Sequence, residues 1–232
     1  MKKYDHPEQL TRMLAEAGLQ GVFPEKLAEN MSLYCFEQGE NLCSKGDKLE
    51  HMYFLLSGKV KIYTISPEGK TLIVRFKTPM AVIGDIEYIK KRDVFNTVEA
   101  VTEGIMAGVS FQEISEFADS DPAFLRFLLE EVTHKFYTES HSSSLNMLYP
   151  VEVRLASYLL SISSDGEGSM FYKEMKTSSL QEIADLIGTS YRHLNRVIQK
   201  LAAEEMIERR NGNLRIKDAA KLRELASGNI YE

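Results

Sequence analysis

The sequence predicts an α+β protein with a β-rich N-terminal domain, a long helix, and a C-terminal helix-turn-helix followed by a β-hairpin. Three observations support this prediction. From Ser32 to Ser110, short apolar segments alternate with turns at a spacing typical of a β-sandwich or barrel. After Asp121-Pro122, no proline interrupts the chain until Pro150. Between residues 178 and 201, two apolar stripes follow the i, i+3, i+4, i+7 spacing of amphipathic helices.

The composition suits a folded chain with one large core or two modest ones. It is 44% hydrophobic and 27% charged over 232 residues. No apolar run approaches the roughly 20 residues that span a bilayer, and the N-terminus lacks the apolar middle of a signal peptide. We therefore expect a cytoplasmic protein with no membrane partner. The two cysteines, Cys35 and Cys43, are interpreted as structural thiols, with a redox switch as the less favoured alternative.

Residues 1–120 are predicted to form the N-terminal domain. Residues 7–29 indicate short helical pieces broken at glycine and proline, and we expect them to cap the β domain. Residues 88–95, YIKKRDVF, predict a loop. The expected strands are 32–36, 41–45, 52–56, 59–65, 71–77, 96–101 and 105–110.

Residues 121–149 are predicted to form a dimerisation helix and hinge. Asp121-Pro122 is a favourable helix start, because an acidic cap precedes proline in the first turn. The polar stretch 139–144 is interpreted as a helix facing water, with a ligand pocket or a hinge as the alternative. An apolar seam for a partner helix is indicated by spacings of four, three and four residues. These spacings separate Leu125, Leu129, Val132 and Phe136.

Residues 150–232 are predicted to form a winged helix. A first helix is expected over 151–163, and the two-helix unit follows it. Gly188 is suited to end the first helix of that unit. Ser179 and Glu182 are expected to cap the start of the first helix, and Ser190 the start of the second. Asn211-Gly212 lies between two strand-like segments, 207–210 and 213–216, which is a strong β-hairpin signal.

The second helix of the unit carries polar side chains opposite its apolar stripe, as a helix that reads a major groove must. From Lys176 to Lys217 the net charge is +3, although the whole chain carries −6. Phosphate binding is therefore expected only in this module. Tyr191 lies nearer the apolar stripe and is expected to reach DNA only through its place in the first turn. The candidate DNA-binding residues are Ser179, Ser190, Tyr191, Arg192, Asn195, Arg196, Gln199, Lys200, Arg209 and Arg210.

Three other interpretations compete with DNA binding. The two-helix unit also fits an ordinary helical hairpin with a solvated polar face. A cupin-type enzyme needs several histidines and a carboxylate around a metal, but the strand region offers only His51, so we predict no catalytic residues, no metal site and no enzyme. A sensor acting through protein contacts, with the hairpin as a dimer prop, would show a weak salt dependence of DNA binding.

The ordered set of motifs resembles the cyclic-AMP-receptor/FNR (Crp/Fnr) family of bacterial transcription regulators, from about Ser32 to Lys217. Arg154-Leu155-Ala156 matches the start of the first helix of the family's DNA-binding domain, and residues 180–201 match its helix-turn-helix. The turns of its jelly-roll, cyclic-nucleotide-binding-like sensor domain are matched by Gly39, Gly46, Gly58, Gly69 and Ile83-Gly84-Asp85. The resemblance implies a homodimer on near-palindromic double-stranded DNA, with RNA polymerase as a further partner.

The resemblance also places an effector pocket, whose residues differ from the family pattern. That pattern has glycine-glutamate for the ribose, arginine-serine for the cyclic phosphate and threonine-serine for the base. The matching positions here hold Gly84-Asp85, Val94-Phe95 and Glu139-Ser140, and the nearest arginine is Arg92.

Valine offers phosphate no hydrogen bond, and carboxylates are gained near the cavity, so the resemblance implies that cyclic AMP is disfavoured. We expect no cofactor, and a pocket that is either filled by its own side chains or holds another effector. An iron–sulfur or haem sensor is a further alternative within the family, but two cysteines cannot supply four ligands, and His51 alone is a poor case for haem.

The recognition helix departs from the family pattern as well. Family members often have arginine and glutamate at the positions that are Tyr191 and Arg192 in this chain. Arg196 matches the arginine that follows in the family pattern. A guanidinium at 196 suits a bidentate contact to guanine, whereas the changes at 191 and 192 should alter the neighbouring base pairs of the half-site.

Overall fold

The computed structural model describes residues 1–65, 71–162, 175–176, 180–210 and 213–226. Its contacts divide into two units: Met1–Ile62 with Phe76–Glu139, and Tyr63–Arg75 with Ser140–Glu232. Helix α5, Pro122–Leu148, contributes residues to both units. The predicted domain limits at 120 and 149 stay predictions. Among the described residues, no helix combines the length and the apolar character needed to cross a membrane.

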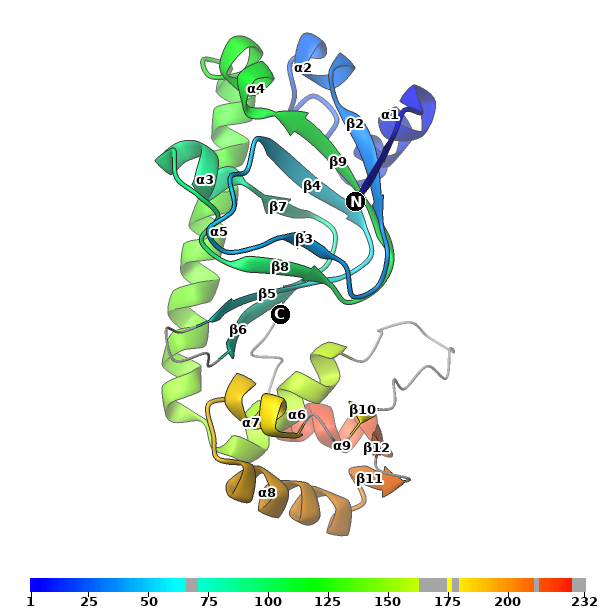
Figure 1. The fold of residues 1–232 in the computed structure, drawn as a ribbon, viewed down its shortest axis with the longest axis vertical. Coiled ribbons are helices and arrows are strands. Elements are labelled where there is room, and N and C mark those ends of the chain that lie inside the picture. The colour runs from blue at the N-terminus through cyan, green and yellow to red at the C-terminus, as the bar shows by residue number, and fades with distance from the viewer. Residues whose placement is uncertain (66–70, 163–174, 177–179, 211–212, 227–232) are drawn as a thin grey trace. The chain divides into compact units, whose positions relative to one another are not determined.

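Two sheets form the β domain, which confirms the predicted sandwich (Figure 1). The larger sheet has the order β1-β2-β9-β4-β7, and its strands are Lys2–Tyr4, Ser32–Phe36, Gly104–Ser110, His51–Ser57 and Ala81–Ile83. The smaller sheet has the order β3-β8-β5-β6, with strands Asn41–Cys43, Thr97–Ala100, Val60–Ile65 and Thr71–Lys77. Strand β1 was not predicted, because three residues carry too little pattern to be recognised.

Both faces of β4 are buried, which explains its continuous apolar sequence. Successive side chains of a strand point to opposite faces of a sheet. Met52 and Phe54 therefore join the core between the larger sheet and its covering helices. Tyr53 and Leu55 join the second core cluster. The covering helices are α1 (Pro7–Glu16), α2 (Glu25–Glu29), α4 (Phe111–Phe117) and the start of α5.

Helix α3, Asp85–Lys90, replaces part of the loop that the sequence predicted at 88–95. That prediction was wrong because tertiary contacts outweigh the weak local signal. Gly84 enters the helix with φ 97°, and a Cβ there would lie 2.8 Å from the His51 carbonyl oxygen, so the chain needs glycine at this point. Tyr88 then anchors the helix by donating a hydrogen bond to Asp119.

The described parts of the C-terminal module form a winged helix, as predicted. The helices are α6 (Val151–Ile162), α7 (Leu180–Leu186), α8 (Tyr191–Ala203) and α9 (Ala219–Ala226). Strands Met175–Lys176 (β10), Asn213–Ile216 (β12) and Ile207–Arg210 (β11) make a small sheet in that order. The predicted hairpin strands are confirmed residue for residue, whereas β10 and α9 were not predicted. Ser179 lies outside the described residues.

Candidate nucleic-acid interface and effector pocket

Helix α8 separates a buried face from an exposed face. Leu194, Val197, Ile198 and Leu201 are at most 3% exposed. Arg192, Arg196 and Gln199 are exposed on the other face, with Lys200 exposed and Asn195 half-buried at its flanks. Tyr191 is 44% exposed, so its side chain is more accessible than its spacing indicated. The helix thus presents guanidinium and amide donors on the surface that a major groove would meet.

The start of α8 is fixed by its cap and by a side chain from α6. Ser190 Oγ accepts a hydrogen bond from the His193 N–H at 3.2 Å. Gly188 takes the left-handed conformation, φ 66°, that ends the preceding helix. Arg154 Nη1 donates to the Ile187 carbonyl oxygen at 2.6 Å, and so ties α6 to this turn. Sequence reasoning used Arg154 only as a family match and missed this contact, because no local spacing signals it.

Lys200 differs from the other candidate contacts on α8 because it has an acidic partner. Lys200 Nζ lies 3.1 Å from Glu152 Oε1 of α6. The hydrogen bond from Lys200 holds the pKa of Glu152 below its usual value, and the same bond raises the pKa of Lys200. The pair is therefore charged on both sides at neutral pH.

Strands β11 and β12 form the wing of the winged helix. The wing contributes Arg209, whose side chain is exposed on β11. On the same hairpin, Arg215 Nη1 lies 3.5 Å from Glu208 Oε1. The side chain of Arg210 and the turn 211–212 lie outside the described part of the chain. The predicted contact of Arg210 with DNA therefore stays a prediction. The structure thus brings together the candidates from Ser190 to Lys200 on one helix, with Arg209 on the hairpin that follows it.

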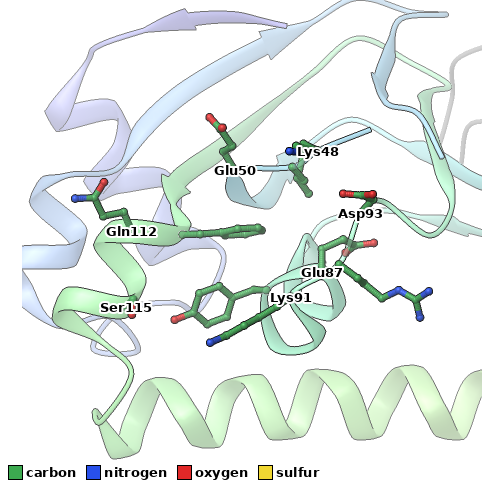
Figure 2. A pocket seen from close by; sticks show the side chains of 11 residues that line it. Lys48, Glu50, Glu87, Lys91, Asp93, Gln112 and Ser115 are labelled. Carbon is green, nitrogen blue, oxygen red and sulfur yellow. The ribbon is translucent and has the colours of Figure 1, made fainter. Parts of the chain in front are cut away.

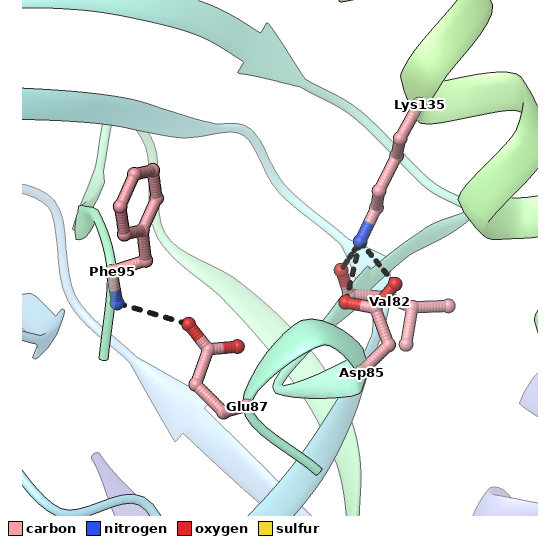
Figure 3. Close-up of polar contacts among 5 residues, drawn as sticks. All are labelled: Val82, Asp85, Glu87, Phe95 and Lys135. Atoms are coloured by element: carbon pink, nitrogen blue, oxygen red, sulfur yellow. Dashed lines mark hydrogen bonds and ion pairs between the residues drawn. The ribbon is translucent and has the colours of Figure 1, made fainter. Parts of the chain in front are cut away.

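Asp85 of the predicted effector pocket is buried and bonded within the chain (Figure 3). The residue is only 2% exposed. Lys135 Nζ of α5 donates to Asp85 Oδ1 at 2.7 Å, to Oδ2 at 2.8 Å and to the Val82 carbonyl oxygen at 2.7 Å. The carboxylate is therefore not an uncompensated negative charge, contrary to the expectation that it would repel an anion. The sequence spacing gave no sign of Lys135.

Val94 and Phe95, the residues at the predicted phosphate position, are held by other contacts. Val94 is 4% exposed in the second core cluster, and its N–H donates to the Asp47 carbonyl oxygen at 2.9 Å. The Phe95 N–H donates to Glu87 Oε1 at 3.0 Å, as Figure 3 shows. The Phe95 ring is 54% exposed, and the Arg92 guanidinium lies 5.7 Å from its centroid. Positions 94 and 95 therefore offer a phosphate no arginine in place of the family's pair, and the nearest arginine is Arg92.

The third predicted pair lies on α5. Ser140 is exposed, and the side chain of Glu139 lies outside the described part of the chain. The division between the two units also falls between these residues. Their part in a pocket stays a prediction.

A cavity of about 460 Å³ opens beside α3 and α4 (Figure 2). Tyr88 and Phe111 form an aromatic wall, with ring centroids 5.2 Å apart. Charged side chains of both signs surround them: Lys48, Lys91, Arg92, Glu50, Glu87 and Asp93. Because the charges are mixed and mostly exposed, the cavity shows no preference for an anion.

Helix α5 has two apolar faces. Phe124 and Leu128 are at most 5% exposed against the β domain. Leu125, Leu129 and Phe136 of the predicted seam are 45%, 67% and 74% exposed, and Val132 is half-buried. Large apolar side chains in a row on a surface indicate an interaction site. The sequence pattern predicted this stripe but not the buried one beside it.

Comparison with known proteins agrees with this architecture. The cyclic nucleotide-binding domain family matches residues 35–121, and the Crp-like helix-turn-helix domain family matches residues 153–225. The regulatory protein YeiL of Escherichia coli O157:H7 is 24% identical over 213 residues, which are 92% of this chain and 94% of that protein. A CRP-like cAMP-activated global transcriptional regulator of Mycobacterium tuberculosis is 21% identical over 220 residues, 92% of this chain and 98% of its own length.

Among solved structures, a regulator of the crp/fnr family from Eubacterium rectale has a similar fold. The TM-score is 0.73 at 18% identity, and the match covers 88% of this chain and 93% of the other. The two matching family domains span well over half of the chain, and they coincide in order with the sandwich and the winged helix. This protein therefore belongs to the Crp/Fnr family of transcription regulators.

Proposed function

We propose that this DNA-binding transcription regulator acts as a homodimer that places its two α8 helices in successive major grooves of a near-palindromic operator. The observation that carries the proposal is the exposed polar face of α8, opposite four buried residues. Arg192 and Arg196 on that face suit bidentate contacts to guanine, which discriminate between base pairs. Arg209 on the wing suits a phosphate contact, which positions the protein without reading sequence.

The exposed stripe of α5 supports the homodimer. Its spacing of four, three and four places Leu125, Leu129 and Phe136 along one side of the helix, where a second copy of α5 would cover them. Two-fold symmetry of the protein would then be mirrored in a palindromic site, with half-sites about 34–36 Å apart. We propose RNA polymerase as a further partner and the cytoplasm as the place of action, because the protein's relatives are bacterial transcription regulators.

The sensor domain is proposed not to respond to cyclic AMP. The Mycobacterium tuberculosis relative is named as cAMP-activated, but Val94 of this chain is a core residue at the position where an arginine would bind the cyclic phosphate. Glu87 also accepts the Phe95 N–H, so that donor is already used within the chain. An anion would therefore find the Glu87 carboxylate beside this segment and no guanidinium at positions 94 and 95.

Selection of bound sequences from a pool of random DNA duplexes, with and without cyclic AMP, tests the proposal. We expect a near-palindromic motif whose enrichment does not depend on the nucleotide. A protein that is monomeric and enriches no sequence contradicts the proposed mode of DNA binding. A motif that appears only with cyclic AMP contradicts the assignment of the sensor alone.

A further inference from the structure

From α8 to α9, the described basic residues differ in their ion pairs. Each lysine there has an acidic partner: Lys200 Nζ lies 3.1 Å from Glu152, Lys217 Nζ lies 2.8 Å from Glu205, and Lys221 Nζ lies 3.7 Å from Asp218. Arg215 also has one, Glu208, at 3.5 Å. Among the side chains that the structure describes, Arg192, Arg196 and Arg209 have no such ion pair. Among these residues, the positive charge without an acidic partner is therefore carried by Arg192, Arg196 and Arg209.

Of these pairs, Lys200 with Glu152 involves a candidate DNA contact. Lys200 lies on α8, one residue after Gln199, and its side chain is 56% exposed. Glu152 belongs to the first turn of α6, where the helix dipole stabilises a carboxylate, and its side chain is only 27% exposed. The anion is thus the more fixed member of the pair, and it comes from outside the recognition helix.

Paired in this way, Lys200 adds little to the attraction for phosphate. Affinity for DNA of any sequence comes from cations that release the counterions of the phosphates they neutralise. A lysine that stays with its carboxylate partner neutralises no phosphate and so releases none. If Lys200 turns toward a phosphate, the carboxylate of Glu152 is left close to the DNA and repels it.

We propose that Glu152 neutralises Lys200 and so limits the sequence-independent affinity of α8 for DNA. This inference rests on the proposed binding of DNA by α8. Arg192 and Arg196 then dominate recognition, and their contacts depend on base sequence. Glu152 lies on α6 rather than on the recognition helix, so its expected effect is on the sequence-independent part of binding.

Substitution Glu152→Gln tests the proposal, because glutamine keeps the shape of the side chain and removes its charge. Binding to a random-sequence duplex is measured by fluorescence anisotropy over a range of salt concentrations. We expect the variant to bind roughly two- to tenfold more tightly near 0.1 M salt, with a log–log salt slope steeper by about 0.9, the value for one added phosphate contact. Binding to the operator should tighten by a similar factor, because a phosphate contact does not depend on base sequence.

Three further variants separate this effect from others. In Glu152→Gln/Lys200→Ala, the gain should disappear, because the released cation is absent. Glu152→Asp retains the charge and should bind random DNA as the unsubstituted protein does. Glu16→Gln makes the same change of net charge on α1, where Glu16 pairs with Arg12 at 3.9 Å, and should leave binding unchanged.

The outcomes are distinguishable. An unchanged slope and affinity in Glu152→Gln overturns the proposal, as does a gain that persists when Lys200 is also replaced. If the unsubstituted protein binds no duplex at all, the proposed function fails first, and this inference fails with it.

Discussion

Lys135 on α5 donates two hydrogen bonds to Asp85, one to each carboxylate oxygen, across 50 residues of sequence. The ammonium gives its third hydrogen bond to the Val82 carbonyl oxygen, so all three of its protons are used. The pair joins the start of α3 to the long helix within the β domain.

Replacing Lys135 by methionine should strongly destabilise the β domain. Asp85 is 2% exposed, and removing its cation leaves a buried carboxylate unpaired, at a cost of about 3–5 kcal/mol. The free energy of unfolding from urea titration measures this loss. Arg126→Met, which removes a cation from an exposed position of the same helix, should change it by less than about 0.5 kcal/mol. Equal effects of the two substitutions would show that the ion pair contributes nothing.

Much of the fold follows from sequence patterns, but this ion pair does not. The strands β4 and β11 and the long helix have strong local signals: an apolar run, a turn dipeptide and an acidic cap followed by proline. Asp85 and Lys135 lie 50 residues apart, and no local period connects them. Their pairing depends on packing between α5 and the end of β7.

Helix α4 was also not predicted, although the sequence contains a clear signal for its start. Ser110 and Glu113 form a complete capping box: Ser110 Oγ accepts the Glu113 N–H at 3.2 Å, and the Glu113 carboxylate accepts the Ser110 N–H at 2.9 Å. The spacing is visible in the sequence and predicts a helix start.

In the DNA interface, by contrast, the polar face of α8 was predictable from its period, whereas the anchoring by Arg154 and Glu152 was not.

Phe136→Glu should weaken the proposed homodimer without unfolding the chain. The side chain is 74% exposed, so few contacts within the chain are lost. A carboxylate on each helix at the seam would raise the dissociation constant by roughly tenfold or more, or about 1.4 kcal/mol. Sedimentation equilibrium measures the constant.

Tyr137→Glu is the matched control for that change. Tyr137 is 69% exposed and follows Phe136 directly, but it lies outside the spacing of four, three and four. Its substitution should leave the dissociation constant within about threefold, less than 1 kcal/mol. An equal loss in both variants would place the interface elsewhere on α5.

The two cysteines should differ in reactivity. Burial raises the pKa of the Cys43 thiol to about 12, and the residue is 8% exposed. Because the thiolate is the nucleophile, iodoacetamide should modify Cys35, which is half-buried, well before Cys43 at pH 8–9. Peptide mass mapping of the native and unfolded protein measures the order, and equal rates in the native protein would contradict it.

The same burial predicts a pH dependence of stability. In the unfolded chain the Cys43 thiol has its ordinary pKa of 9.0, whereas in the folded chain burial raises its pKa to about 12. The unfolded state therefore loses protons first, and folding stability falls as pH rises through this interval. Cys43→Ala should lower the urea midpoint at pH 7 but show a smaller further drop between pH 9 and 11.

Arg196→Ala tests the central claim, the reading of sequence by α8, most directly. Affinities for the selected operator and for a random duplex are measured over the same range of salt concentrations, with Arg209→Ala as the comparison. We predict that Arg196→Ala costs about 1–3 kcal/mol on the operator, relaxes one base position and changes random-duplex binding little. Arg209→Ala should weaken binding to both duplexes alike and reduce the salt slope by about 1. If Arg196→Ala also weakens both duplexes alike, α8 does not read the bases, and the account is wrong.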